Sequence, residues 1–188
     1  MPLVVPSNIK SIAMKNNYSY FFLISLVLAL VSCGQESSTP KGVSLTPISF
    51  AAWDKQLAQY QGDIVVADLW ATWCQPCIKR FPKMVELNKQ YADRAVTFVS
   101  INFDDTGDGE SLQKAESYLK EVNAEFDNFY FKENLIDAFE HMGVIALPVV
   151  VIYGKDGKEA ARLTNIDPNN QFTEADIENT INRLLAAN

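Results

Sequence analysis

The chain has 188 residues, of which 48% are hydrophobic, and its formal net charge is −7. This length and apolar content suit one domain with its own core and a short appendage, and they exclude a disordered or collagen-like protein. The negative charge also argues against nucleic acid as the main partner, because phosphate backbones attract basic proteins.

Residues 20–31 form a mostly apolar run that is too short to cross a bilayer as a helix, which needs about 20 residues. Lys15 gives this run a positive flank, a pattern that is typical of a secretory signal peptide. Met14 is an alternative start to Met1, because a lysine follows it directly. We therefore expect residues 1–32 to be a targeting segment that exports the rest of the chain.

The apolar run ends in Leu30-Val31-Ser32-Cys33, which resembles the lipobox of bacterial lipoproteins. That resemblance implies a lipidated Cys33 as the first mature residue, and it accounts for the odd number of cysteines. The alternative is an ordinary signal peptide, or an uncleaved anchor, with an incidental Cys33. Residues 33–43 are mostly small and polar and predict a flexible tether. The expectation is an exported, membrane-anchored lipoprotein that faces the periplasm or the cell exterior.

Residues 44–188 alternate between strand and helix patterns. The expected elements are, in chain order, a helix over 49–60, a buried strand over 64–70, a helix over 75–91, a second buried strand over 96–103, a helix over 110–122, a short strand over 127–131, a helix over 133–141, a third strand over 148–153, its hairpin partner over 158–163 and a final helix over 174–186. Ser49 and Thr173 are the expected N-caps of the first and last helices. This alternation predicts an α/β domain with a central mixed sheet flanked by helices.

The chemistry is expected where the first buried strand meets its helix, in Asp68-Leu69-Trp70-Ala71-Thr72-Trp73-Cys74-Gln75-Pro76-Cys77. Attack on a disulfide requires a thiolate. Cys74 would lie at the helix N-terminus, where free N–H groups and the helix dipole stabilise an anion. Pro76 tolerates an early helical position. We therefore expect Cys74 to be the exposed, attacking sulfur and Cys77, one turn further in, to be the resolving sulfur.

These residues resemble the thioredoxin superfamily, and within it the membrane-anchored TlpA-like and ResA-like group. The matching features are the Trp73–Cys77 core, the buried acid Asp68, the helix-kinking Pro82, and Pro148 preceded by Gly143. Residues 104–140 are similar to the insertion that this group carries before its cis-proline loop. The resemblance covers about residues 45–187. It implies a thioredoxin-like fold and a redox-active Cys74–Cys77 pair that needs no organic cofactor or metal.

The resemblance also implies roles for residues around the cysteines. Asp68 would be a general acid/base for the Cys77 thiol, with a pKa raised by burial; the alternative is a carboxyl bonded to backbone or water at the strand edge. Pro148 would be a cis proline that faces the cysteines, with Leu147 in contact with a protein substrate; the alternative is a proline that only opens a strand. The remaining expected substrate-binding residues are Trp73, Gln75 and Pro76.

Two departures from the group bear on the chemistry. Arg80 stands where ResA-like proteins often carry a glutamate, so the sequence does not support their cytochrome-maturation role. A cation near the helix start should instead favour the thiolate. Thioredoxins also place a lysine near the buried acid, whereas Val99-Ser100-Ile101 offers none. Asp68 is therefore expected to lack that lysine partner, which would leave its acidity still weaker.

The expected function is disulfide exchange with protein thiols, in the reducing direction, with recharging by a membrane thiol-transfer protein. The direction depends on the potential of the cysteine pair, which the sequence does not determine. The rival is a lipid-anchored binding module with a structural Cys74–Cys77 disulfide, although so small a loop adds little stability. A thiol peroxidase is disfavoured, because the cysteines lie in a Cys-x-x-Cys motif instead of a Pro-x-x-x-Thr-x-x-Cys motif.

Metal binding is also disfavoured by the sequence. Besides Cys33, a zinc site at the cysteine pair could draw only on His141, and zinc usually takes four ligands. The acidic stretch 104–110 lacks the acid that a calcium loop carries at its twelfth position, which is Ala115 here. This stretch is therefore expected to be a solvated loop.

Overall fold

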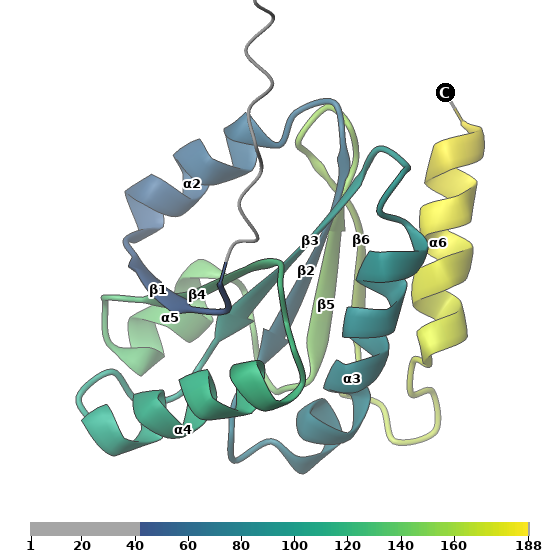
Figure 1. Cartoon of the computed structure of the whole chain (residues 1–188). Helices are drawn as coiled ribbons and strands as arrows, with labels where there is room; N and C mark the ends of the chain where they lie inside the picture. Colours follow the sequence, from purple (N-terminus) through teal and green to yellow (C-terminus); the bar gives the residue numbers. More distant parts are fainter. Residues whose placement is uncertain (1–41, 188) are drawn as a thin grey trace, which may run out of the picture. The chain divides into compact units, whose positions relative to one another are not determined.

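A computed structural model describes residues 42–187 (Figure 1). The predicted targeting segment 1–32, the lipidation candidate Cys33 and the tether up to residue 41 lie outside the described residues. Within the described part, every helix is too short or too polar to cross a membrane.

Strands and helices alternate along the described part of the chain. The strands are β1 (Leu45–Ile48), β2 (Ile64–Trp70), β3 (Val96–Asn102), β4 (Asp127–Phe131), β5 (Val149–Tyr153) and β6 (Glu159–Thr164). The helices are α2 (Phe50–Gln59), α3 (Gln75–Gln90), α4 (Gly109–Glu121), α5 (Leu135–His141) and α6 (Glu174–Ala186). The predicted mixed sheet flanked by helices is confirmed, and each predicted element is present within two residues of its expected ends.

The strands form one six-stranded sheet in the order β1-β4-β3-β2-β5-β6. The first four strands in this order run parallel, β5 runs antiparallel to β2, and β6 runs antiparallel to β5. Helices α3 and α6 lie side by side on one face (Figure 1). Trp53 of α2 and Ala138 of α5 belong to a second apolar cluster, which contains the β2 side chains that point to the opposite face of the sheet. Every residue of β2 is buried, as expected of a central strand covered on both faces.

Side chains of β2 alternate between the two faces of the sheet. Ile64 and Val66 pack in the cluster with α3 and α6, whereas Val65, Ala67 and Leu69 pack in the other cluster. Asp68 continues the first series, so its carboxyl points to the α3 side. The carboxyl end of β2 leads directly into the loop before α3, and this connection positions the cysteines.

Strand β1 was not predicted. It has four residues, Leu-Thr-Pro-Ile, and pairs only with β4 at the sheet edge. Pro47 cannot donate to a ladder hydrogen bond and is tolerated because the strand is an edge strand. A segment this short, with a proline and only partial burial, carries no recognisable strand periodicity. Its place in the sheet comes from pairing with the inserted strand β4.

Candidate active site

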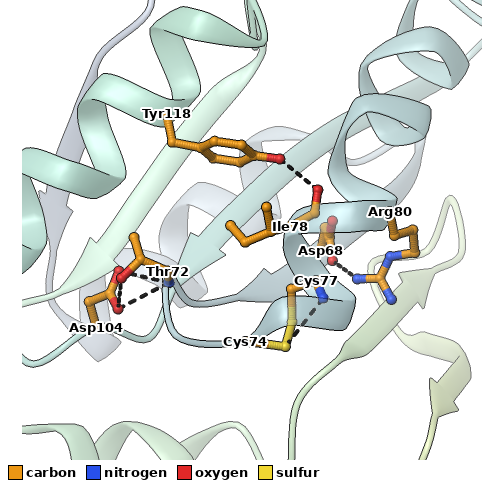
Figure 2. The surroundings of a disulfide bond; sticks show 8 residues. All are labelled: Asp68, Thr72, Cys74, Cys77, Ile78, Arg80, Asp104 and Tyr118. Carbon is orange, nitrogen blue, oxygen red and sulfur yellow. Dashed lines mark hydrogen bonds and ion pairs between the residues drawn. A yellow bond between two sulfur atoms is a disulfide. The ribbon is translucent and has the colours of Figure 1, made fainter.

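The two cysteines lie at the junction of β2 and α3. Cys74 is the N-cap of α3 and is disulfide-bonded to Cys77, with their Cα atoms 5.3 Å apart. The backbone N–H of Cys77 donates to the Cys74 sulfur at 3.3 Å (Figure 2). Pro76 occupies the first turn, where its missing N–H leaves no intrahelical bond unmade. The Cys74 sulfur therefore lies where N–H groups and the helix dipole favour a negative charge.

The prediction that Cys74 is exposed is wrong for the disulfide-bonded form. Cys74 is 5% exposed and Cys77 is fully buried. The reason is that the bond ties the Cys74 sulfur toward the buried Cys77, while its neighbours Trp73, Gln75 and Pro76 are exposed instead. The small exposed fraction belongs to Cys74, so a partner reaches this sulfur first.

Asp68 is fully buried and forms an ion pair with Arg80 of α3 (Figure 2). Burial raises the pKa of Asp68 to about 6, although the charge and hydrogen bond of Arg80 oppose this rise. The raised pKa agrees with the sequence prediction. The prediction that Asp68 lacks the lysine partner of thioredoxins is confirmed, but Arg80 of α3 lies beside it as a different cation. On β3, Asp68 is paired with Ser100, and that strand contains no lysine.

A second buried acid holds the loop before Cys74. Asp104 is 2% exposed and accepts hydrogen bonds from the backbone N–H and the hydroxyl of Thr72, at 3.1 and 2.8 Å (Figure 2). The side-chain amide of Asn102 also donates to Asp104, at 2.8 Å. The expectation of a solvated loop is thus wrong at Asp104. The strand register could have indicated this contact, because Trp70 is paired with Asn102 at the same sheet edge.

The inserted helix α4 braces the active-site helix. Pro82 lies inside α3 and has no N–H, so the carbonyl of Ile78 loses its usual intrahelical donor. The hydroxyl of Tyr118 donates to this carbonyl at 2.8 Å (Figure 2). Tyr118 also packs against the rings of Trp70 and Phe81. The sequence indicated Pro82 but not Tyr118, which comes from a different element.

The proline loop has the cis peptide bond that the resemblance implied. The Leu147–Pro148 peptide bond is cis, and Pro148 is buried. Leu147 is partly buried and packs against the apolar cluster that contains both cysteines. Ile145, two residues earlier, is 82% exposed, and Trp73 is 56% exposed. Trp73 of the cysteine loop and Ile145 before the proline loop thus expose apolar side chains.

His141, considered above as a zinc ligand, lies at the end of α5 and stacks on Phe50 with ring centroids 4.1 Å apart. Residues 42–187 contain no group of three or more histidine, cysteine or acidic residues that could hold a metal ion. The site is therefore described by its sulfurs, its two buried acids and the proline loop.

Comparison with known proteins gives several relatives. The thiol-disulfide oxidoreductase ResA of Bacillus thuringiensis subsp. konkukian is 28% identical over 119 residues, which are 63% of this chain and 65% of that protein. The thioredoxin-like protein YneN of Bacillus subtilis is 37% identical over 73 residues, 39% of this chain and 37% of that protein. The chain thus spans less than two thirds of the length of these relatives.

Solved structures agree with the fold. A thiol:disulfide interchange protein of the thioredoxin family from Chlorobium tepidum matches with a TM-score of 0.53 and 25% identity, over 68% of this chain and 83% of that one. A secreted disulfide oxidoreductase of Mycobacterium tuberculosis matches in fold with a TM-score of 0.54 and 21% identity, over 68% of this chain and 86% of that one. The family model described as thioredoxin-like matches residues 62–159, more than half of the chain. The chain therefore belongs to the thioredoxin-like family.

Proposed function

We propose that this protein is a thiol–disulfide oxidoreductase that exchanges disulfides with protein substrates through Cys74 and Cys77. The observation that carries the proposal is the position of the Cys74 sulfur as the N-cap of α3, 3.3 Å from a backbone N–H. A thiolate formed there is stabilised and is the more accessible of the two sulfurs. The names of the ResA relatives support the same activity.

The first step is attack by the reduced protein on its substrate. The Cys74 thiolate attacks one sulfur of a substrate disulfide, the substrate S–S bond breaks, and a mixed disulfide with Cys74 forms. The leaving substrate sulfur departs as a thiolate and takes a proton from water. The N–H of Cys77 and the helix dipole stabilise the attacking thiolate before this step.

The second step resolves the mixed disulfide. The Cys77 thiol gives its proton to the Asp68 carboxylate and attacks the Cys74 sulfur, which re-forms the bond seen in the structure. The bond between Cys74 and the substrate breaks, and the second substrate sulfur leaves as a thiolate that is protonated from Asp68 or from water. Two electrons have then passed from the dithiol to the substrate.

Protein substrates are favoured by the surface around the sulfurs. Trp73, Gln75 and Pro76 are exposed beside Cys74, and Leu147 and Pro148 form the neighbouring loop. The exposed apolar side chains suit an extended protein segment better than a small polar thiol. We propose that these five residues contact the substrate during exchange.

We further propose that the protein acts as a reductant outside the cytoplasm, tethered by a lipid on Cys33 and recharged by a membrane thiol-transfer protein. The lipobox-like Leu30–Cys33 supports the location, and the resemblance to the TlpA-like group supports the direction. Fatty-acid labelling of the full chain, compared with Cys33→Ala, tests the anchor. Equilibration of Cys74 and Cys77 with glutathione tests the direction, because a reductant has a potential well below that of oxidising relatives.

Turnover is tested with insulin reduction by the full chain in the presence of a chemical reductant. We expect reduction by the wild-type chain and loss of activity in Cys74→Ser, which removes the attacking sulfur. Absence of turnover in the wild-type chain, together with a reduced Cys74 that does not react with alkylating reagents, would favour the rival binding module.

A further inference from the structure

A buried ion pair lies one helical turn beyond the disulfide. Cys77 and Arg80 are both buried residues of α3, and their spacing of three residues puts them on the same helix face. Arg80 is 7% exposed, and its guanidinium binds the fully buried Asp68 (Figure 2). The guanidinium of Arg80 therefore places a positive charge beside the Asp68 carboxyl.

Arg80 is held from a second side. Its guanidinium carbon lies 4.9 Å from the centre of the Phe172 ring, in the loop before α6. The backbone N–H of Phe172 donates to Asn165 at 2.9 Å, which fixes the loop. A planar guanidinium can stack and form an ion pair at once, so Arg80 is locked in its position toward Asp68.

Only one oxygen of the Asp68 carboxyl accepts a hydrogen bond from the described residues. Its Oδ1 accepts from Arg80, whereas Oδ2 is buried and has no hydrogen-bond partner among the described residues. A buried acceptor without a donor is unfavourable, and it gains by taking a proton. Figure 2 shows the carboxyl on the Cys77 side of the guanidinium. One oxygen is thus anchored and the other is free to receive a proton.

The other groups around Asp68 do not compete with Arg80. Its neighbours in the sheet are Ser100 on β3 and Val150 on β5, neither of which titrates. On α4, burial and then the charge of Asp68 raise the pKa of Tyr118 to about 12, so this phenol stays neutral. Arg80 is the charged group that acts on Asp68.

We propose that Arg80 is a positioning residue that keeps Asp68 ionised and oriented, so that its free oxygen accepts the Cys77 proton when the mixed disulfide is resolved. The inference rests on the proposed function. In it, the ionisation and orientation of the base Asp68 depend on Arg80, a residue of the cysteine-bearing helix α3. Without Arg80, Asp68 would stay protonated to higher pH, because both contributions that oppose the effect of burial would be lost.

The test is the pH dependence of resolution in Arg80→Met, measured on the full chain by rapid mixing with a fluorescent peptide disulfide. We expect resolution to slow about fivefold or more at pH 6, where Asp68 of the wild-type chain is about half-ionised, because a rise of one unit in its pKa leaves about a tenth of it ionised. The pH of half-maximal resolution should rise. The pH profile for alkylation of reduced Cys74 should not change. The ion pair of Asp68 and Arg80 has no net charge, and the protonated Asp68 that replaces it in the variant has none either.

Lys79→Met is the matched control, since Lys79 is the adjacent cation of α3 but is exposed. It should leave the pH profile of resolution unchanged. Arg80→Lys should restore part of the rate, because it returns the charge without the planar fork. Arg80→Gln keeps a donor for Oδ1 without the charge, so it makes the same test if Arg80→Met does not fold.

The outcomes separate the two proposals. If the wild-type chain forms no mixed disulfide with the peptide, the proposed function fails. If the wild-type chain turns over and a folded Arg80→Met or Arg80→Gln variant resolves its mixed disulfide with the wild-type pH midpoint, the role of Arg80 is overturned while the proposed function stands.

Discussion

Two buried aspartates flank the disulfide, and they are used in opposite ways. Asp104 is 2% exposed and receives hydrogen bonds from the Thr72 backbone, the Thr72 hydroxyl and the Asn102 amide. Among residues 42–187, the fully buried Asp68 has Arg80 as its one hydrogen-bond partner, and its second oxygen has none. Two aspartates that are buried to a similar extent thus differ in their hydrogen bonding: both oxygens of Asp104 accept hydrogen bonds, whereas only one oxygen of Asp68 does.

Burial alone therefore does not make a carboxyl reactive. Both oxygens of Asp104 accept hydrogen bonds, including those from Thr72 in the loop before Cys74, so Asp104 stabilises the position of the N-cap. Asp68 keeps an oxygen for proton transfer and is stabilised by a charge instead of by several donors. The comparison can be tested on stability, on pH dependence and on rate.

The largest expected effect is on stability at Asp68. Asp68→Leu leaves the Arg80 guanidinium buried without a counter-ion, and we expect a loss of about 3–5 kcal/mol in the free energy of unfolding. The double variant Asp68→Leu/Arg80→Met should be close to wild type, because an apolar pair of similar volume replaces the ion pair. Urea unfolding of the oxidised proteins measures both. A double variant as unstable as the single one would contradict this account of the pair.

The second expected effect is a pH dependence of stability that comes from Asp68. The pKa of Asp68 is raised to about 6, so the folded state holds this proton more tightly than the unfolded chain. Its contribution to stability is therefore present below about pH 4 and is lost as the pH rises through about 6, by about 3 kcal/mol. The oxidised wild type, measured against the double variant between pH 4 and 7, should lose this much. A flat difference would show that Asp68 is not perturbed.

The third expectation concerns rate. Asp68→Asn removes the proton acceptor for Cys77, and we expect resolution of the mixed disulfide to slow about 100-fold. Asp104→Asn should change the same rate by only a few fold, because Asp104 holds the loop and takes no proton. Rapid mixing with a peptide disulfide measures both rates. Equal slowing in the two variants would remove the distinction between the acids.

The smallest expected effect is on stability at Asp104. Asp104→Ala leaves the two Thr72 donors and the Asn102 amide without their acceptor, and we expect a loss of about 2 kcal/mol. Asp105→Ala is the matched control, since Asp105 is exposed and should cost under about 0.5 kcal/mol. Thermal unfolding of the oxidised proteins compares the two. A cost at Asp104 no larger than that at Asp105 would show that the buried contact adds nothing.

The sequence predicted what depends on neighbours along the chain. The Cys-x-x-Cys at a strand–helix junction, the buried strand around Asp68 and the capped helices follow from short patterns, and the cis Pro148 followed from family resemblance. The Asp68–Arg80 pair and the Asp104–Thr72 contact join residues 12 and 32 positions apart. Such contacts depend on how the elements pack, so a pattern within one element does not show them, and only features of two elements taken together can point to one.

The position of Arg80 in the sequence does carry a signal for the ion pair. It lies in the stripe of buried α3 positions that includes Cys77, Phe81 and Met84. A charged residue in an apolar helical stripe needs a buried partner, and the sequence offers one acid in the strand beneath it. The buried acid in β2 and the cation in the apolar stripe of α3 together predict the ion pair, in which Arg80 stands in place of the lysine of thioredoxins.

The central claim is that Cys74 captures substrates and Cys77 releases them. The most direct measurement is the intact mass of the Cys77→Ser chain after incubation of its reduced form with a peptide disulfide. We expect a stable adduct of the chain with one peptide thiol, attached at Cys74 and removed by reductant. An unmodified Cys74, or an adduct that forms equally well in the Cys74→Ser/Cys77→Ser variant, would contradict the claim.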